Sequence, residues 1–388
     1  MVSILLGVGL LVAVFVGFNI GGSSTGVAFG PAVGSRIVTK LAAAGLMTVF
    51  ALLGGWTVGR NVVETMGGEI VAQTYFTLGA SVAVLFFIGL ALLVSNTFGV
   101  PASTSMTAVG AIAGLGVASD SIDWEVMGQI VSWWLVAPVI AFWVSAVIGR
   151  YLYPYLERAL NVDSNAGEVV ELDRSGAIPV PRFVDGVGAR EITVSIAVVV
   201  IACYMAFSAG ASNVANAVAP LVGSGELSMD VGILLAGGAI GLGAFTIARR
   251  TLDTVGNDLT DLPLPAALVV EVVAASLITF LSVIGIPASL AVSATMSIVG
   301  LGWGRATRTV SVGQMVSGEG RPKMSVNALA AEPGNDVPRI GEEDERELTA
   351  SDLFDPETTG RVVVLWILTP SIAALASFVL FTLVPLYQ

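Results

Sequence analysis

The chain has 388 residues, 55% of them hydrophobic and only 12% charged, with a mean hydropathy of +0.87. A soluble domain carries about twice that share of charge, so the composition excludes a water-soluble globule and predicts that most of the chain lies in lipid. The net charge of −12 argues against nucleic acid as a partner. Histidine is absent and Cys203 is the single cysteine, which argues against an enzyme because the commonest general base is missing.

Apolar runs of roughly 20 residues, the length that a helix needs to cross a bilayer, recur along the chain. Two shorter segments are apolar but rich in Ser, Thr and Gly. We therefore expect an all-α integral membrane protein with about ten transmembrane segments. The expected long spans are 2–34, 41–58, 71–95, 126–148, 192–222, 231–248, 265–284 and 362–387, and the short segments are 101–117 and 287–303.

Matched residues divide the chain into two homologous halves. From Gly21 to Gly210 the offset is 189 residues, and at this offset Gly54 falls on Gly243. Five crossings in each half make the second half enter from the opposite side, which is the inverted-repeat plan of secondary transporters. The expected domains are a first transmembrane repeat (1–153), a cytoplasmic linker (154–190) and a second transmembrane repeat (191–388) with a polar cytoplasmic loop at about 305–361.

The basic residues predict the orientation of the chain. With both termini outside the cell membrane, most of them fall inside, in agreement with the positive-inside rule, and both long polar loops are cytoplasmic. Arg60 falls outside, and its expected role is to anchor a helix end at the interface, the alternative being to draw anions toward the mouth. The residues expected inside are Arg36, Lys40, Arg150, Arg158, Arg249, Arg250, Arg305 and Arg308.

Four clusters of Gly, Ser, Thr and Asn occupy corresponding places in the two halves, at 17–24, 101–105, 208–213 and 287–289. We expect each to break a helix, because irregular backbone at membrane depth is tolerated where it lines a cavity. Free N–H groups at such breaks, with hydroxyl and amide donors, would hold an anion. The alternative is that these small residues only let helices pack closely.

Glu271 is an acid inside an apolar run, 268–273, and an acid at that depth is costly and usually functional. It could bind a cation or carry a proton. The alternative is a carboxylate near the end of the span that reaches water. The residues expected to couple a cation such as Na⁺ are Asn19, Asn213, Asn216 and Glu271.

The repeated clusters resemble the inorganic phosphate transporter (PiT) family, in which a motif reading roughly GANDVANAFG is followed by AVGSR and a PVSTTH motif precedes VGA. Here the second copy of the first motif is GASNVANA (210–217), the first copy is GGSSTGVAFG (21–30) followed by AVGSR (32–36), and the hydroxyl motif is PASTS (101–105). Glu271, 16 residues before Pro287, falls where the family has a glutamate. The resemblance covers both halves.

This resemblance implies symport of inorganic phosphate, coupled to Na⁺ or H⁺, by alternating access. No other cofactor is implied. The matched segments would converge near the middle of the membrane, and the family's site positions fall on residues that we take as substrate-binding. These are Ser23, Ser24, Ser103, Thr104, Ser105, Ser212, Asn213, Asn216 and Ser289.

Ser24 and Asn213 stand where the family has aspartate, which should weaken a cation site. Protonated phosphate can donate a hydrogen bond to a carboxylate, whereas sulfate cannot, so neutral replacements lower the discrimination against sulfate. The opening Asn19-Ile20-Gly21 also resembles a sulfate-permease branch of the family. A sulfate permease is therefore the first alternative, and a passive anion channel is a more distant one. Membrane lipid is the other expected partner, and a homo-oligomer is compatible with the sequence.

Overall fold

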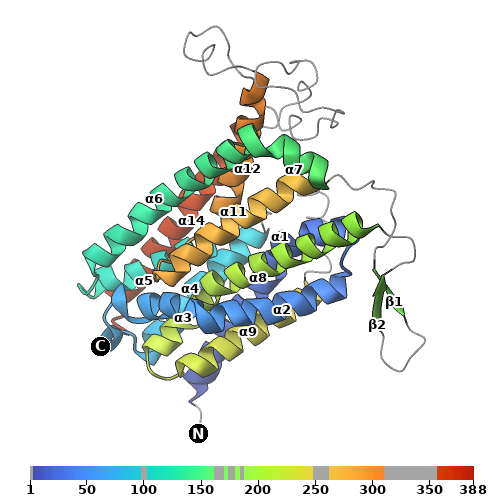
Figure 1. Cartoon of the computed structure of the whole chain (residues 1–388). Coiled ribbons are helices and arrows are strands. Elements are labelled where there is room, and N and C mark those ends of the chain that lie inside the picture. The colour runs from blue at the N-terminus through green and yellow to red at the C-terminus, as the bar shows by residue number, and fades with distance from the viewer. Residues whose placement is uncertain are drawn as a thin grey trace, which may run out of the picture.

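The computed structural model describes residues 3–97, 103–160, 170–173, 180–183, 188–247, 262–309 and 356–388. In these ranges the chain is a bundle of long helices (Figure 1). The first half of the chain supplies α1 (Ile4–Gly34), α2 (Lys40–Thr57), α3 (Gly59–Glu64), α4 (Leu78–Thr97), α5 (Thr104–Ala118), α6 (Trp124–Val147) and α7 (Tyr153–Leu160). The second half supplies α8 (Ala189–Gly223), α9 (Met229–Thr246), α11 (Leu264–Val283), α12 (Leu290–Ala306) and α14 (Pro356–Leu383).

The helices fit a membrane. In the described part of the chain, seven are long and apolar enough to cross a bilayer, and two shorter apolar helices, Leu78–Val94 and Thr104–Ala118, accompany them. Many large apolar side chains lie exposed along α6 and α14, as lipid-facing residues do. The chain is therefore a multi-pass membrane protein. The helix α12 has 17 residues, and the expected count of ten crossings stays a prediction.

The central helices pack in reciprocal pairs, α1 with α9 and α2 with α8. A Cβ added at Gly21 would lie 1.9 Å from the carbonyl oxygen of Ile240, and one added at Gly210 would lie 2.0 Å from that of Ala51. The offset of 189 residues that relates Gly21 to Gly210 also relates Ala51 to Ile240. Each helix backbone thus rests on its neighbour at equivalent points, which only glycine permits.

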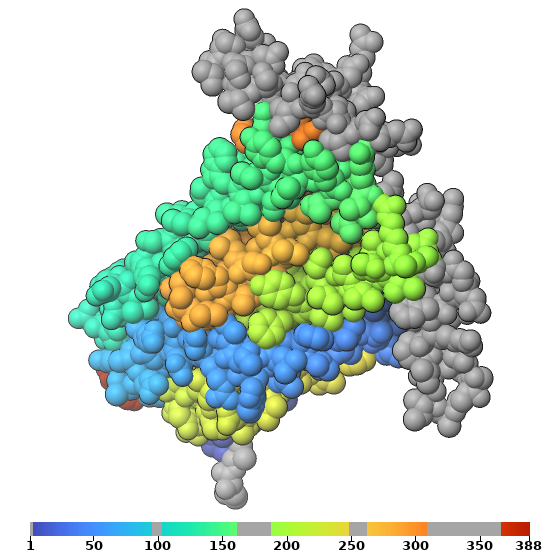
Figure 2. Space-filling view, viewed as in Figure 1, coloured from blue at the N-terminus to red at the C-terminus, as the bar shows by residue number. Residues whose placement is uncertain are grey.

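The peripheral helices repeat this arrangement. The helix α5 packs against α14 from the other half, and α12 packs against α6. Gly114 faces the carbonyl oxygen of Ala374, and Gly300 faces that of Phe142. In the space-filling view, α11 lies between α6 and α8, both of which it contacts (Figure 2).

The expected breaks at 17–24 and 208–213 are wrong, because α1 and α8 run through them as continuous helices. Glycine costs a helix about 1 kcal/mol, whereas an unpaired backbone group in lipid costs several. The hydroxyls also bond within the helix, as Thr25 Oγ1 donates to the carbonyl of Gly21 at 2.6 Å. At these positions the small residues serve close helix packing. At the other two clusters helices do begin, after Ser103 and Ser289.

One further expectation needs correction. The span expected at 71–95 begins later, at Leu78, because Gln73–Tyr75 forms a 3₁₀ turn and Val71 pairs with Ile122. The linker expected at 154–190 contains most of α7, which continues α6 through a π-helical turn, Ile148–Leu152. It also contains an antiparallel strand pair, β1 (Val170–Asp173) and β2 (Val180–Phe183). Most of the polar loop expected at 305–361, together with Arg249 and Arg250, lies outside the described residues.

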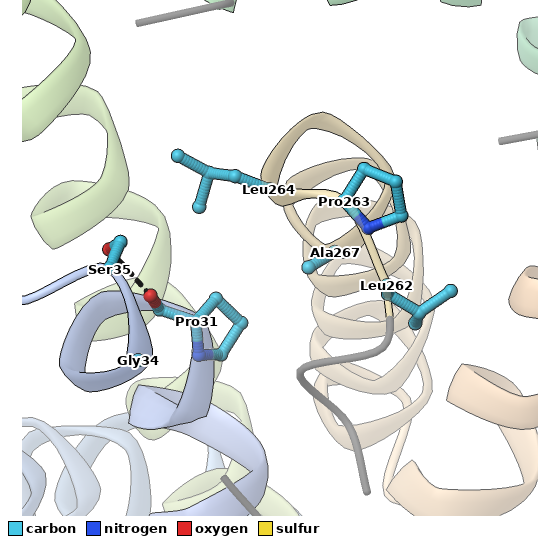
Figure 3. Close-up of a pocket in the computed structure, with 7 residues that line it drawn as sticks. All are labelled: Pro31, Gly34, Ser35, Leu262, Pro263, Leu264 and Ala267. Carbon is cyan, nitrogen blue, oxygen red and sulfur yellow. Dashed lines mark hydrogen bonds between the residues drawn. The ribbon is translucent and has the colours of Figure 1, made fainter. Parts of the chain in front are cut away.

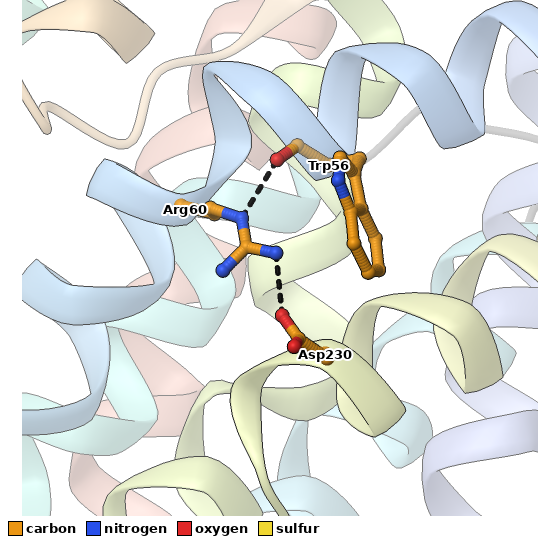
Figure 4. Close-up of polar contacts among 3 residues, drawn as sticks. All are labelled: Trp56, Arg60 and Asp230. Atoms are coloured by element: carbon orange, nitrogen blue, oxygen red, sulfur yellow. Dashed lines mark hydrogen bonds and ion pairs between the residues drawn. The ribbon is translucent and has the colours of Figure 1, made fainter.

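Arg60 joins the two halves at one end of the bundle (Figure 4). Its Nη2 lies 2.5 Å from Asp230 Oδ1 in the first turn of α9, its Nε donates to the carbonyl of Trp56 at 2.8 Å, and its guanidinium lies 4.6 Å from the centre of the Trp56 ring. Because both charged side chains are partly exposed, the ion pair contributes at most about 1 kcal/mol. These contacts agree with the anchoring role, since the charge of Arg60 is already offset by Asp230.

Candidate functional site: an oxyanion cavity between two helix N-termini

A polar cavity of about 100 Å³ lies between the two halves. This volume is well above the ~15 Å³ that one water molecule requires. Seven of the residues expected at the site line the cavity, and they come from α1, α5, α8 and the residue before α12. They are Asn19, Ser23, Ser24, Thr104, Ser105, Asn213 and Ser289, and the remaining lining residues are Val27, Leu92, Leu290 and Ala291.

Two helix N-termini meet at this cavity, one from each half. Thr104 and Ser105 are the first two residues of α5, and Leu290 and Ala291 are the first two of α12. The N–H groups at these positions have no partner within their own helix. Each also stands at the positive end of a helix dipole. The cavity is therefore bordered by backbone donors from both halves, the arrangement that binds anions elsewhere.

The helix caps leave one further donor in the cavity. Ser103 Oγ accepts the N–H of Met106 at 3.3 Å, and Ser289 Oγ accepts that of Val292 at 3.3 Å. A serine hydroxyl that accepts from the backbone still has its own proton to give. Ser289 borders the cavity and can donate this proton to a bound anion. Ser103 is 1% exposed, caps α5 and is not among the residues that line the described cavity.

A buried chain of hydrogen bonds lies behind the cavity. Ser212 Oγ donates to the carbonyl of Ala288 at 2.7 Å and lies 3.3 Å from Ser105 Oγ. Asn216 Nδ2 donates to Ser105 Oγ at 3.1 Å and to Asn213 Oδ1 at 3.0 Å. The chain ties α8 to the start of α5 and to the residues before α12. Ser212 and Asn216 therefore support the cavity from behind, where the sequence placed them among the substrate ligands.

Two matched prolines lie inside the long helices, Pro31 in α1 and Pro220 in α8. A proline has no N–H, so the carbonyls of Val27 and Asn216, four residues earlier, lose their usual helical donor. Val27 borders the cavity, and Asn216 Oδ1 is buried without a hydrogen-bond partner. Carbonyl and amide oxygens of this kind are suitable ligands for a hard cation.

A second cavity of about 270 Å³ lies where α1 ends and α11 begins (Figure 3). Pro31, Gly34 and Ser35 form one side, and Pro263, Leu264 and Ala267 contribute to the other. On α1 this cavity lies about one helical turn beyond the first, because Pro31 follows Val27 by four residues. We call this space the vestibule.

Glu271 borders neither cavity, yet it belongs to the same face of α11. It follows Ala267 by four residues, so it lies roughly 6 Å further from the vestibule along the helix axis. Its side chain is 4% exposed, and its Oε1 has no hydrogen-bond partner in the described part of the chain. The alternative that this carboxylate reaches water near a span end is wrong for this structure.

The apolar part of the cavity lining could not be predicted from the sequence. Val27 and Leu92 lie within apolar runs of the same composition as lipid-facing runs, so their residue types do not distinguish them as cavity-lining residues. Leu290 and Ala291 could be predicted at the site only because they directly follow Ser289 in the sequence. They contribute backbone N–H groups, which every residue type except proline has, so their side chains carry no signal.

Together these features define a class of protein. A multi-pass helical bundle has a polar cavity between its halves, bordered by backbone and side-chain donors, and a vestibule about one helical turn further along α1, as in transporters of small anions. The model of the phosphate transporter family matches residues 20–377. The chain belongs to this family, and the resemblance inferred from the repeated motifs is confirmed.

Two similar proteins help to place the chain within the family. The sulfate permease CysP of Bacillus subtilis is 30% identical over 294 residues, which is 76% of this chain and 76% of that protein. A solved structure described as the sodium-dependent phosphate transporter superposes with a TM-score of 0.66 at 18% identity. It covers 98% of this chain and 100% of that one. At this identity the structural likeness concerns the fold.

Proposed function

We propose that this protein is a secondary transporter of a tetrahedral inorganic oxyanion, with phosphate as the first substrate. The observation that carries the proposal is the meeting of the α5 and α12 N-termini at one polar cavity between the two halves. A dianion there is held by four N–H groups at dipole ends and by amide and hydroxyl donors, without a buried arginine. Membership of the phosphate transporter family favours phosphate. Transport requires no chemical step, so the protein acts as a carrier and not as an enzyme.

The mechanism that we propose is alternating access between two inverted repeats. The reciprocal glycine contacts at one constant offset support this, as does the pairing of α5 with α14 and of α12 with α6. The matched helices α1 and α8 also run in opposite directions, because Gly9 meets Leu221 while Ser24 and Asn213 share the cavity. A carrier built in this way moves one repeat against the other around a fixed central site, and this favours a carrier over a passive channel.

A coupling cation would bind beside the same cavity. Glu271, the carbonyl freed at Val27 and the unpaired Oδ1 of Asn216 offer oxygen ligands at this depth. Na⁺ is the expected ion, with H⁺ as the alternative. The sodium dependence named for the structural relative agrees with Na⁺.

A second candidate substrate is sulfate. The chain is 30% identical to a sulfate permease, and no acidic side chain lines the described cavity. A lining without a carboxylate lacks the charged acceptor that would favour the proton that phosphate carries. Sulfate thus competes with phosphate for the same donors.

The proposed setting is the cell membrane, with both termini outside and the polar loops cytoplasmic. The vestibule lies next to Arg36, so it would open toward the cytoplasm under the positive-inside rule. In this scheme 1–153 and 191–388 are the two repeats and 154–190 joins them. Membrane lipid surrounds the bundle.

The decisive experiment is uptake of radiolabelled phosphate and of radiolabelled sulfate into proteoliposomes, each with and without an inward Na⁺ gradient. Saturable phosphate uptake that the Na⁺ gradient stimulates is the expected result. Sulfate uptake without phosphate uptake would instead assign the protein to the second candidate. Uptake of both anions that neither saturates nor responds to substrate on the far side would replace the carrier by a channel.

A further inference from the structure

The hydrogen-bond chain behind the cavity has a fixed direction. It begins at the carbonyl of Ala288, which can only accept, so Ser212 must donate its proton there. Ser212 Oγ is then the acceptor for the hydroxyl of Ser105, 3.3 Å away. With its proton given to Ser212, Ser105 can only accept from Asn216. The group that Asn216 turns toward Ser105 is therefore its NH₂.

The same direction continues to Asn213. The Asn216 NH₂ group also meets the Asn213 side chain, which must present its oxygen, and Nδ2 to Oδ1 is 3.0 Å. Asn213 borders the cavity and directs its oxygen at the Asn216 NH₂ group, so its own NH₂ group, on the other side of the amide, is the part left to the cavity. The carbonyl of Ala288, four hydrogen bonds away, therefore sets the orientation of the Asn213 amide.

We propose that this hydrogen-bond chain turns the NH₂ group of Asn213 toward the cavity, and that this amide is what admits sulfate alongside phosphate. This inference rests on the proposed oxyanion transport. A fully deprotonated dianion has acceptors on every oxygen and is satisfied by N–H and O–H donors alone. The hydroxyl of protonated phosphate needs an acceptor, which the Asn213 amide does not present, and a mismatched polar contact is what a selective site penalises.

The first test is Asn213→Asp, which keeps the size of the side chain. One carboxylate oxygen still accepts from Asn216, while the other brings an acceptor and a negative charge to the cavity. The measurement is inhibition of labelled phosphate uptake by unlabelled sulfate and by unlabelled phosphate. In the wild type both anions should inhibit at concentrations within about tenfold of each other. In the variant, sulfate should weaken relative to phosphate by about tenfold or more, as expected for an unpaired buried polar contact.

The second test changes only the direction of donation along the hydrogen-bond chain. Ser212 does not border the cavity, and Ser212→Ala releases the hydroxyl proton of Ser105 to turn toward Asn216. The two amides can then reverse together, and the Asn213 oxygen faces the anion. We expect the preference to move toward phosphate by a few-fold, in the same direction as Asn213→Asp. Ser208→Ala is the matched control, because Ser208 lies one turn before Ser212 on α8 and is equally buried. Ser208 donates to the carbonyl of Ala275, which takes no part in the hydrogen-bond chain.

Binding is measured in parallel as the thermal stabilisation of detergent-solubilised protein by each anion, so that a variant that binds but does not transport still reports its preference. The inference is overturned if Asn213→Asp keeps the wild-type ratio, or if Ser208→Ala shifts the ratio as much as Ser212→Ala. Wild-type protein that neither transports nor binds either anion would instead refute the proposed function, and this inference with it.

Discussion

At the scale of the single residue, Glu271 carries a carboxyl group into the apolar middle of α11, where it is 4% exposed and its Oε1 is unpaired. An acidic side chain at the centre of a membrane helix costs about 3 kcal/mol. Such a cost is retained where the charge is used, and in the proposed scheme this carboxylate shares a coupling cation with the oxygens of Val27 and Asn216. The carboxyl group is therefore the residue on which we expect coupling to depend.

Replacing Glu271 by glutamine keeps the shape of the side chain and removes its charge. We expect net uptake driven by the Na⁺ gradient to fall at least about tenfold, which corresponds to roughly 1.4 kcal/mol. Exchange of labelled for unlabelled anion at equal concentrations should persist, because the donors at the cavity are untouched. Glu69→Gln is the control, since Glu69 is exposed near the end of the bundle, where it accepts from Thr65. Full Na⁺ stimulation in Glu271→Gln would exclude this role.

At the scale of the element, the contacts between helix backbones hold the two halves together. The reciprocal positions Gly21 and Gly210 both leave no room for a methyl group against a facing carbonyl. Gly21→Ala and Gly210→Ala should each force their helix pair apart and lower the stability by about 1 to 3 kcal/mol, as overpacking does. Gly7→Ala, in α1 with open space around it, should cost nothing. The measurement is thermal unfolding in detergent, and equal midpoints for Gly7→Ala and Gly21→Ala would contradict the prediction.

These elements also mark what the sequence could predict. Apolar runs and a constant offset are enough to find the long helices, because lipid forces each span to satisfy its own backbone. The residue types in these clusters could not distinguish a helix break from a close helix–helix contact. Gly21 and Gly210 are small in either case, and only the facing carbonyls of Ile240 and Ala51 decide between the two. The polar lining of the cavity followed from the motifs, whereas the separation of Ser212 and Asn216 from that lining needed three-dimensional positions.

At the scale of the whole molecule, the vestibule and the turn between α8 and α9 lie at opposite ends of the bundle. The helices α8 and α11 run in the same direction, since Ser208 meets Ala275 and Ser212 meets Ala288. Leu264 begins α11 at the vestibule, whereas Glu226 follows the far end of α8. Glu226 is exposed and Leu264 is partly exposed at the vestibule, so a reagent in water can be used to label the two faces of the membrane separately.

The test replaces the buried Cys203 by alanine and adds one cysteine at a time, Leu264→Cys or Glu226→Cys. In right-side-out vesicles a membrane-impermeant thiol reagent should modify only the cysteine at 226, and in inside-out vesicles only the one at 264. If the vestibule lies on the transport route, anion binding should shift the protein between its inward-open and outward-open states. The reagent should then modify the cysteine at 264 at a different rate, while the rate of modification at 226 stays the same. Reversed labelling would invert the orientation and place the vestibule outside. Labelling of both from one side would contradict the arrangement of α8 and α11, and with it the route from the central cavity.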